Sequence, residues 1–133
     1  MFRSIFFILT IFPLTLWAHE GHDHTPGAVI PPKGGVIRTL ETIHLEMLPH
    51  GKTVKIFIYD KNLKPVETKN YPVSATATKP RSKPEALDLK AEKNYWEYTY
   101  DSKGAHRYAL QFNIEQGGHK DKIKWNIEPK HKH

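Results

Sequence analysis

The stretch TIHLEMLPHGKTVKIFIYD, residues 42–60, decides the fold because its apolar residues recur at every second position. Side chains of a strand alternate between two faces, so this period is typical of a strand with one buried face. Segment 53–60 is rich in β-branched and aromatic residues, which favour strands. Proline and glycine punctuate segment 49–52 as a turn. The sequence therefore predicts two strands, 42–48 and 53–60, joined by that turn.

The same alternation recurs on both sides of this stretch, at spacings of about ten residues. The further expected strands are 36–40, 73–79, 95–100, 105–114 and 123–127. Segment 86–94 fits either the start of a helix or a short strand, and segment 60–66 is expected to be a hairpin connection. Seven or eight short strands separated by turns are typical of an antiparallel immunoglobulin-like β-sandwich. A small β-barrel is the alternative all-β fold.

The strand parities also predict which side chains form the core. The predicted core residues are Ile43, Leu45, Val54, Ile56, Ile58, Leu110, Phe112, Trp125 and Ile127. His106 falls on the apolar parity of its segment, so it is expected to be packed and hydrogen-bonded rather than to bind a ligand. Met47 is expected to face the core as well.

The two ends of the chain differ from the strand-rich middle. Residues 1–18 have a charged head, an apolar run and a small final residue, the layout of a secretory signal peptide cut after Ala18. The apolar run is too short for a bilayer span, so no membrane span is expected in the mature chain. Residues 19–34 predict a flexible arm, 35–128 the sandwich and 129–133 a polar tail. We therefore expect a periplasmic or secreted protein.

The composition restricts the chemistry that such a protein performs. The absence of cysteine excludes thiolate metal sites and disulfides. The formal net charge of +6 raises the question of nucleic acid, but export and the lack of an arginine cluster argue against that partner. No nucleophile, phosphate-loop or zinc-protease motif is present, so a non-enzymatic protein is expected. The distinctive side chains are the nine histidines.

Three of these histidines open the expected arm, in the sequence HEGHDH. His19, His22 and His24 alternate with carboxylates at ligand-like spacings, a set that suits divalent transition-metal ions. Copper is favoured, with zinc, nickel or cobalt as alternatives. Cleavage before His19 would add its α-amino group to its imidazole as a square-planar chelate for Cu²⁺. A soluble leader without a function is the alternative interpretation.

A second candidate metal site lies in residues 42–60. His44 and Glu46 are two residues apart on one predicted strand, so both project from the same face, about 6.5 Å apart along it. His50 follows in the predicted turn and completes this set. The alternative interpretation is that His44 and Glu46 are two solvated polar side chains on an outer face.

The order of these motifs resembles a family of small periplasmic proteins associated with bacterial heavy-metal and copper efflux systems. The resemblance rests on HEGHDH, a Gly-Gly pair, HLEML and GKTVKIFIYDKNLKPV, and it covers residues 19–66. The same sequence pattern is similar to the N-terminal metal-binding domain of some efflux-pump periplasmic adaptor subunits. Lys33 stands where that pattern commonly has a histidine before the Gly-Gly pair. The resemblance implies a β-sandwich, metal handling and an efflux-pump adaptor subunit as the partner.

The sequence therefore predicts a periplasmic carrier or buffer for copper or a similar divalent ion, linked to heavy-metal efflux or resistance. The alternative is a sandwich module that binds a protein or a glycan, with the histidines incidental. In that alternative the contact would be made by Trp96, Tyr98 and Tyr100, which share one strand parity.

Overall fold

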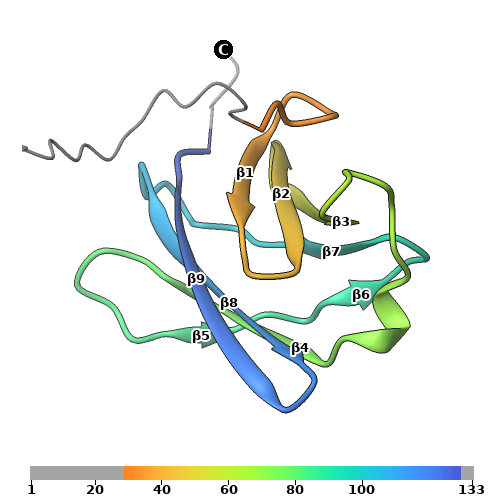
Figure 1. Cartoon of the computed structure of the whole chain (residues 1–133). Coiled ribbons are helices and arrows are strands. Elements are labelled where there is room, and N and C mark those ends of the chain that lie inside the picture. Colours follow the sequence, from red (N-terminus) through yellow and green to blue (C-terminus); the bar gives the residue numbers. More distant parts are fainter. Residues whose placement is uncertain (1–28, 130–133) are drawn as a thin grey trace, which may run out of the picture.

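The computed structural model describes residues 29–129 and folds them into two antiparallel sheets that lie face to face (Figure 1). The first sheet has the strand order β1-β2-β3-β7-β6 and the second has the order β5-β4-β8-β9. The strands are β1 Val36–Thr39, β2 Ile43–His50, β3 Thr53–Asp60, β4 Val73–Thr78, β5 Glu85–Ala86, β6 Lys90–Ala91, β7 Tyr95–Thr99, β8 Tyr108–Gln116 and β9 His119–Ile127. A 3₁₀ turn, η1, spans Thr68–Asn70.

The strand order is that of an immunoglobulin-like sandwich. Such a fold has strands A, B, E and D in one sheet and C, F and G in the other. Here β2, β3, β7 and β6 take the places of A, B, E and D, while β4, β8 and β9 take those of C, F and G. Strand β1 adds an outer strand to the first sheet, and β5 adds one to the second. This confirms the predicted sandwich over the barrel, because within residues 29–129 no strand pairing joins the two sheets.

The decisive stretch forms the predicted hairpin, but its turn is shorter than expected. Pro49 and His50 continue β2, paired with Val54 and Thr53, and the chain reverses at Gly51 with φ 65°. Proline is tolerated there because β1 pairs with β2 only as far as Met47, so β2 has an open edge beyond that point.

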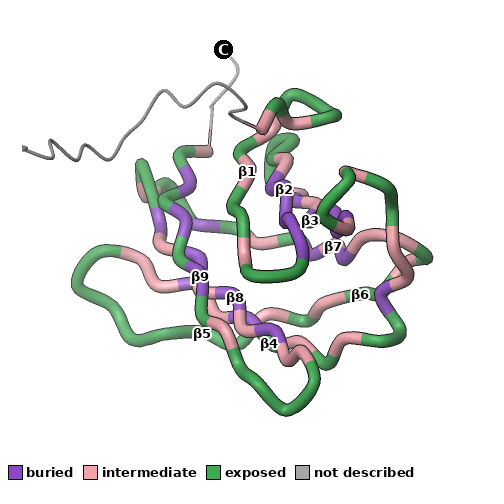
Figure 2. The backbone as a smooth tube through the Cα atoms, in the orientation of Figure 1, coloured by how far each residue is buried: buried purple, intermediate pink, exposed green. Residues whose placement is uncertain are grey.

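The core lies between the sheets and contains all nine residues predicted for it, together with Met47 (Figure 2). Trp96 and Tyr98 are also buried there, each with an exposed fraction of 2%, so they are not available to a protein or glycan partner. Tyr98 shares a hydrogen bond of 2.7 Å with the hydroxyl of Tyr108. Burial raises the pKa of both phenols above the usual value.

One connection differs from the sequence-based expectation. Segment 60–66 does not join a hairpin, because β3 and β4 belong to different sheets. The chain first folds back on the end of β3, where the Val66 amide donates to the Ile58 carbonyl at 3.2 Å, and then crosses through η1. For segment 86–94 the structure has the short-strand alternative and no helix, since Ala86 ends β5 and Lys90–Ala91 forms β6.

His106 was expected in the core, and that prediction is wrong. The pairing of β8 with β9 begins at Tyr108, opposite Ile127. The alternation therefore does not extend back to His106, which lies exposed in the preceding loop.

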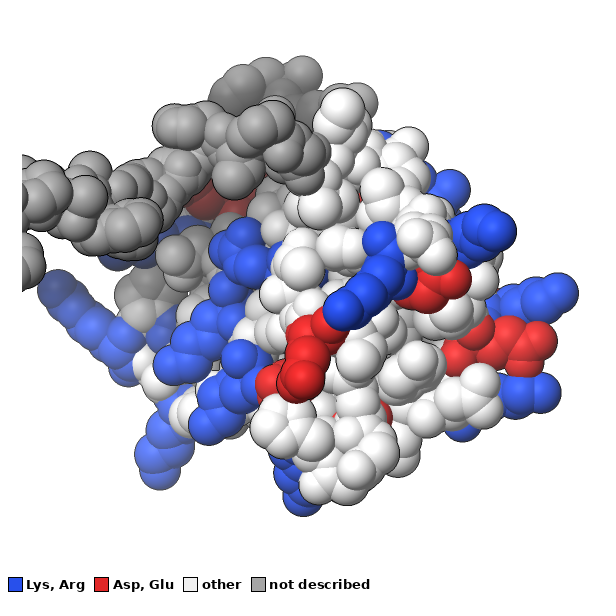
Figure 3. Space-filling view, viewed as in Figure 1, with Lys and Arg blue, Asp and Glu red and all other residues white. Residues whose placement is uncertain are grey.

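The outer edge of the second sheet is basic. Strand β9 is an edge strand whose alternate residues Lys120, Lys122 and Lys124 are exposed. Figure 3 shows lysine and arginine side chains gathered on the side of the molecule where β9 lies. Lysines on an edge strand oppose edge-to-edge aggregation with the strands of another chain. Across residues 29–129, no helix has the length and apolar character needed to cross a bilayer.

Candidate functional site

The three histidines of the expected arm, His19, His22 and His24, lie outside the described residues. The folded candidates His44 and Glu46 are described, and they share one face of β2 as the period-two pattern predicts. This face points away from the inter-sheet core, yet both side chains are buried, with exposed fractions of 6% and 0%. The interpretation of His44 and Glu46 as two solvated side chains is therefore wrong.

Glu46 is buried because the segment before β1 folds over it. Its carboxylate accepts hydrogen bonds from the Lys33 amide at 3.0 Å and from the Gly35 amide at 2.7 Å. The Tyr59 hydroxyl donates a third bond at 2.8 Å to the other oxygen. The pKa of Tyr59 is raised, mainly by burial and to a smaller extent by the hydrogen bond to Glu46. We call Lys33, Gly35, Glu46 and Tyr59 the Glu46 latch, because they hold the start of the fold on the first sheet.

Glycine is required at position 35 of this latch. A β-carbon at Gly35 would overlap the backbone carbonyl oxygen of Met47 and would also crowd the Glu46 side chain. Gly34 differs, since its φ of 76° places it in a left-handed turn with open space around it. The Gly34 amide closes this turn by donating to the Pro31 carbonyl at 3.2 Å. The Gly-Gly pair of the sequence thus combines a turn with a close approach of two backbones.

We expect Gly35→Ala to lower the free energy of unfolding by about 1–3 kcal/mol, because a backbone carbonyl must move to make room. Chemical denaturation measures this loss. Gly34→Asn is the matched control, since asparagine tolerates a left-handed backbone and nothing crowds that position. Equal unfolding midpoints for the Gly35 variant and the unchanged protein would contradict the close approach.

The other two folded candidates do not complete a ligand set around Glu46. The Nδ1 atom of His44 lies 2.9 Å from the Thr39 hydroxyl, across the β1–β2 pair. His50 is exposed at the far end of β2. Among residues 29–129, no three histidine, aspartate or glutamate side chains gather closely enough to hold a metal ion. Within this part of the chain, the Glu46 carboxylate is directed to the latch donors.

Aromatic rings and lysines cover the face beside the latch. The ammonium group of Lys33 lies 4.8 Å from the centroid of the Phe57 ring, and that of Lys55 lies 5.1 Å from the centroid of Tyr95. The Phe57 and Tyr95 rings contact each other with centroids 4.9 Å apart. These lysines therefore lie against π faces, an arrangement that adds modest stabilisation.

The sequence pattern did not predict that Tyr59 would be a partner of Glu46. Tyr59 pairs with His44 in the β2–β3 register, so its parity already placed it on the same face as Glu46. The strand parity therefore indicated that the two side chains share a face. It did not indicate that the Tyr59 hydroxyl would donate a hydrogen bond to a buried carboxylate.

Comparison with known proteins supports the fold and nothing more specific. No family model matches the sequence, and no curated protein matches it. A solved structure of a DUF4426 family protein from Pseudomonas aeruginosa PAO1 is similar, with a TM-score of 0.53 and 14% sequence identity. The match covers 72% of this chain and 99% of that one. At this identity the likeness concerns the sandwich alone, and the name of that family specifies no activity.

Proposed function

We propose that this protein is an exported, non-enzymatic carrier or buffer for a divalent transition-metal ion, with copper favoured. In this proposal His19, His22 and His24 are the main ligands, and the sandwich is the rigid support on which they are carried. Imidazole suits copper, zinc, nickel and cobalt, and closely spaced ligands on a chain segment wrap an ion and release it again.

The observation that carries the proposal is that the Glu46 carboxylate is occupied by hydrogen bonds within the fold. In the folded part of the chain, the candidate carboxylate Glu46 already accepts hydrogen bonds from three donors, two backbone amides and a phenol. Those bonds hold Lys33 and Gly35, which follow the histidine-rich segment in the sequence, on the first sheet. This division of roles supports capture by the segment before the fold, with the sandwich as its anchor, and it leaves His44 and His50 as secondary ligands.

The cellular role follows from the resemblance and is part of the same proposal. The signal-like residues 1–18 support a periplasmic or secreted location. The motifs shared with small efflux-associated proteins favour a link to heavy-metal efflux, with a periplasmic adaptor subunit as the partner. The alternative, a protein- or glycan-binding module, loses its main support because Trp96 and Tyr98 are core residues.

Two changes distinguish the ways in which the histidines would bind. We expect His22→Ala combined with His24→Ala to weaken Cu²⁺ binding by about tenfold or more if the segment wraps the ion, since two of its imidazoles are lost. One residue added before His19 weakens binding most if the terminal amino group and the His19 ring form the chelate. Calorimetric titration of the chain that starts at His19 measures both effects.

The matched control is His44→Gln combined with His50→Ala, which removes the two imidazoles of β2. It is expected to change Cu²⁺ affinity by less than about threefold, a free-energy change well under that of a lost main ligand. A larger loss in this control than in the His22 and His24 variant would contradict the proposed site.

A further inference from the structure

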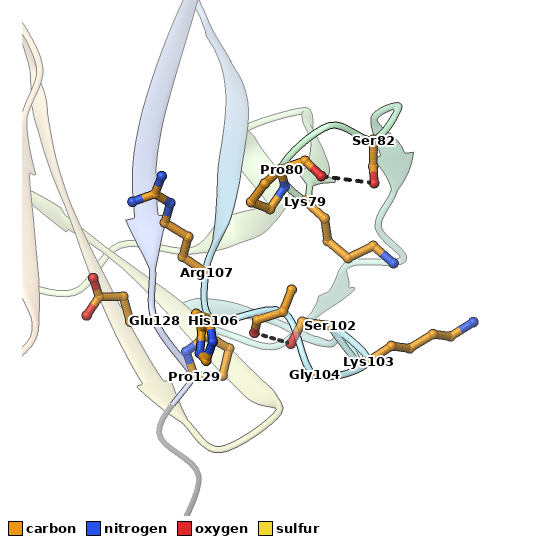
Figure 4. Close-up of a pocket in the computed structure, with 11 residues that line it drawn as sticks. Lys79, Pro80, Ser82, Ser102, Lys103, Gly104, His106, Arg107, Glu128 and Pro129 are labelled. Carbon is orange, nitrogen blue, oxygen red and sulfur yellow. Dashed lines mark hydrogen bonds between the residues drawn. The ribbon is translucent and has the colours of Figure 1, made fainter.

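The loop end of the sandwich carries a hollow that the metal proposal does not use. Its volume is about 870 Å³, within the usual size range of ligand sites. It lies between the β4–β5 loop, the β7–β8 loop and the end of β9. Figure 4 shows these three segments converging. The lining residues are Lys79, Pro80, Ser82, Ser102, Lys103, Gly104, Ala105, His106, Arg107, Glu128 and Pro129.

Basic side chains dominate this end of the molecule. An adjoining hollow shares Lys79 and Arg107 with the first and adds Arg81. In Figure 4, Lys79 and Lys103 extend to one side, whereas Arg107 extends to the other. Within residues 29–129, none of these four cations makes an ion pair with a carboxylate. Asp101, which follows β7, is bonded instead to Lys52 and to the Lys103 amide.

The backbone gives a second, independent indication at the same place. Among residues 29–129, only three non-glycine residues have positive φ, and two of them, Arg81 and Lys103, belong to these loops. Arg81, with φ 60°, follows Pro80 in a turn closed by the Ser82 amide donating to the Lys79 carbonyl at 3.1 Å. Glycine normally takes that position after proline.

Lys103, with φ 49°, precedes Gly104 in a turn closed by the Ala105 amide donating to the Ser102 carbonyl at 3.0 Å. Asparagine, aspartate or glycine is the usual residue at such a position. Two neighbouring turns thus place a long cation where a small residue would cost less. Backbone outliers of this kind concentrate at functional sites, where the side chain is needed.

We infer that this loop end binds a small polyanion with several phosphate groups, an oligophosphate chain, across the cations Lys79, Arg81, Lys103 and Arg107. A single phosphate would occupy a small part of the hollow and would meet the cations of one side only. A chain of phosphates spans both sides, and each added charge-assisted hydrogen bond strengthens binding. The site uses none of the proposed metal ligands, so it goes beyond the proposed function.

Tripolyphosphate and orthophosphate are the probes, titrated at equal ionic strength into the full chain after chelator treatment. A pH of 8 lies above the ordinary pKa of an imidazole, which limits the positive charge of the histidine-rich segment. We expect tripolyphosphate to bind at least about tenfold more tightly than orthophosphate. Amide shifts should concentrate in residues 79–82 and 102–107. Equal affinities, or shifts confined to other parts of the chain, would overturn the inference.

The variant Arg81→Gly combined with Lys103→Gly separates function from folding. Glycine relieves the left-handed backbone, so the melting temperature should stay equal or rise by up to about 5 °C. Tripolyphosphate affinity should nevertheless fall at least about tenfold. Leu63→Gly is the backbone control, because Leu63 has φ 62° without a charge. Lys61→Gln is the charge control. Unchanged affinity in the double variant, or an equal loss in Lys61→Gln, would overturn the inference.

Discussion

Replacing Phe112 with alanine is expected to lower the free energy of unfolding by about 3–5 kcal/mol. Phe112 is fully buried in β8, and its ring contacts Trp96 of the first sheet, with centroids 5.4 Å apart. It also contacts Trp125 of its own sheet, with centroids 6.4 Å apart. Removal of the ring leaves a cavity between the sheets that two indoles cannot close without moving their strands. Urea denaturation followed by tryptophan fluorescence measures the loss.

Ile56→Ala tests the same core from the opposite sheet. Ile56 is fully buried in β3 and pairs with both Met47 and Trp96 across its neighbours, so a loss of about 2–5 kcal/mol is expected. Lys55→Ala is the matched control, because the adjacent residue projects from the other face of β3. Losses below about 0.5 kcal/mol at both Phe112 and Ile56 would contradict the strand parities.

The second large effect is expected at Glu46. We predict that Glu46→Ala lowers the free energy of unfolding by about 2–4 kcal/mol, because a buried phenol and two backbone amides lose their acceptor together. The same change should release the start of the fold, so the Lys33 and Gly35 amides should exchange with solvent faster. Denaturation and hydrogen exchange measure the two effects independently.

Tyr59→Phe is the control for that prediction. It removes one donor and leaves Glu46 bonded to the Lys33 and Gly35 amides, so a loss of about 1 kcal/mol is expected. The Glu46 latch would be contradicted if both variants unfolded at the same denaturant midpoint. It would be contradicted equally if the amides exchanged at unchanged rates in the Glu46 variant.

The sequence predicted the strands well because alternation is a local property. Residues 53–60 form β3 as expected, and all nine predicted core residues are buried. Pairing partners are not local, and they were predicted less well. A period-two pattern indicates that β3 and β4 are strands, but it does not indicate that the intervening chain crosses from one sheet to the other.

The errors at polar residues have a related cause. The parity that placed His44 and Glu46 on one face was correct, but the cover over that face comes from residues 33–35, which have no periodic pattern. His106 was misplaced because the alternation was extended past the true start of β8. The loop-end hollow could not be found from the sequence, since its cations come from loops separated by two short strands and β7.

The role assigned to the histidine-rich segment is the central claim, and one calorimetric comparison tests it most directly. Cu²⁺ and Zn²⁺ are titrated into the chain that starts at His19 and into a chain that lacks residues 19–25. The longer chain is expected to bind Cu²⁺ at least about tenfold more tightly, because the shorter one has lost three imidazoles. Equal binding of both ions by the two chains would contradict the account and would leave His44 and His50 as the candidate ligands.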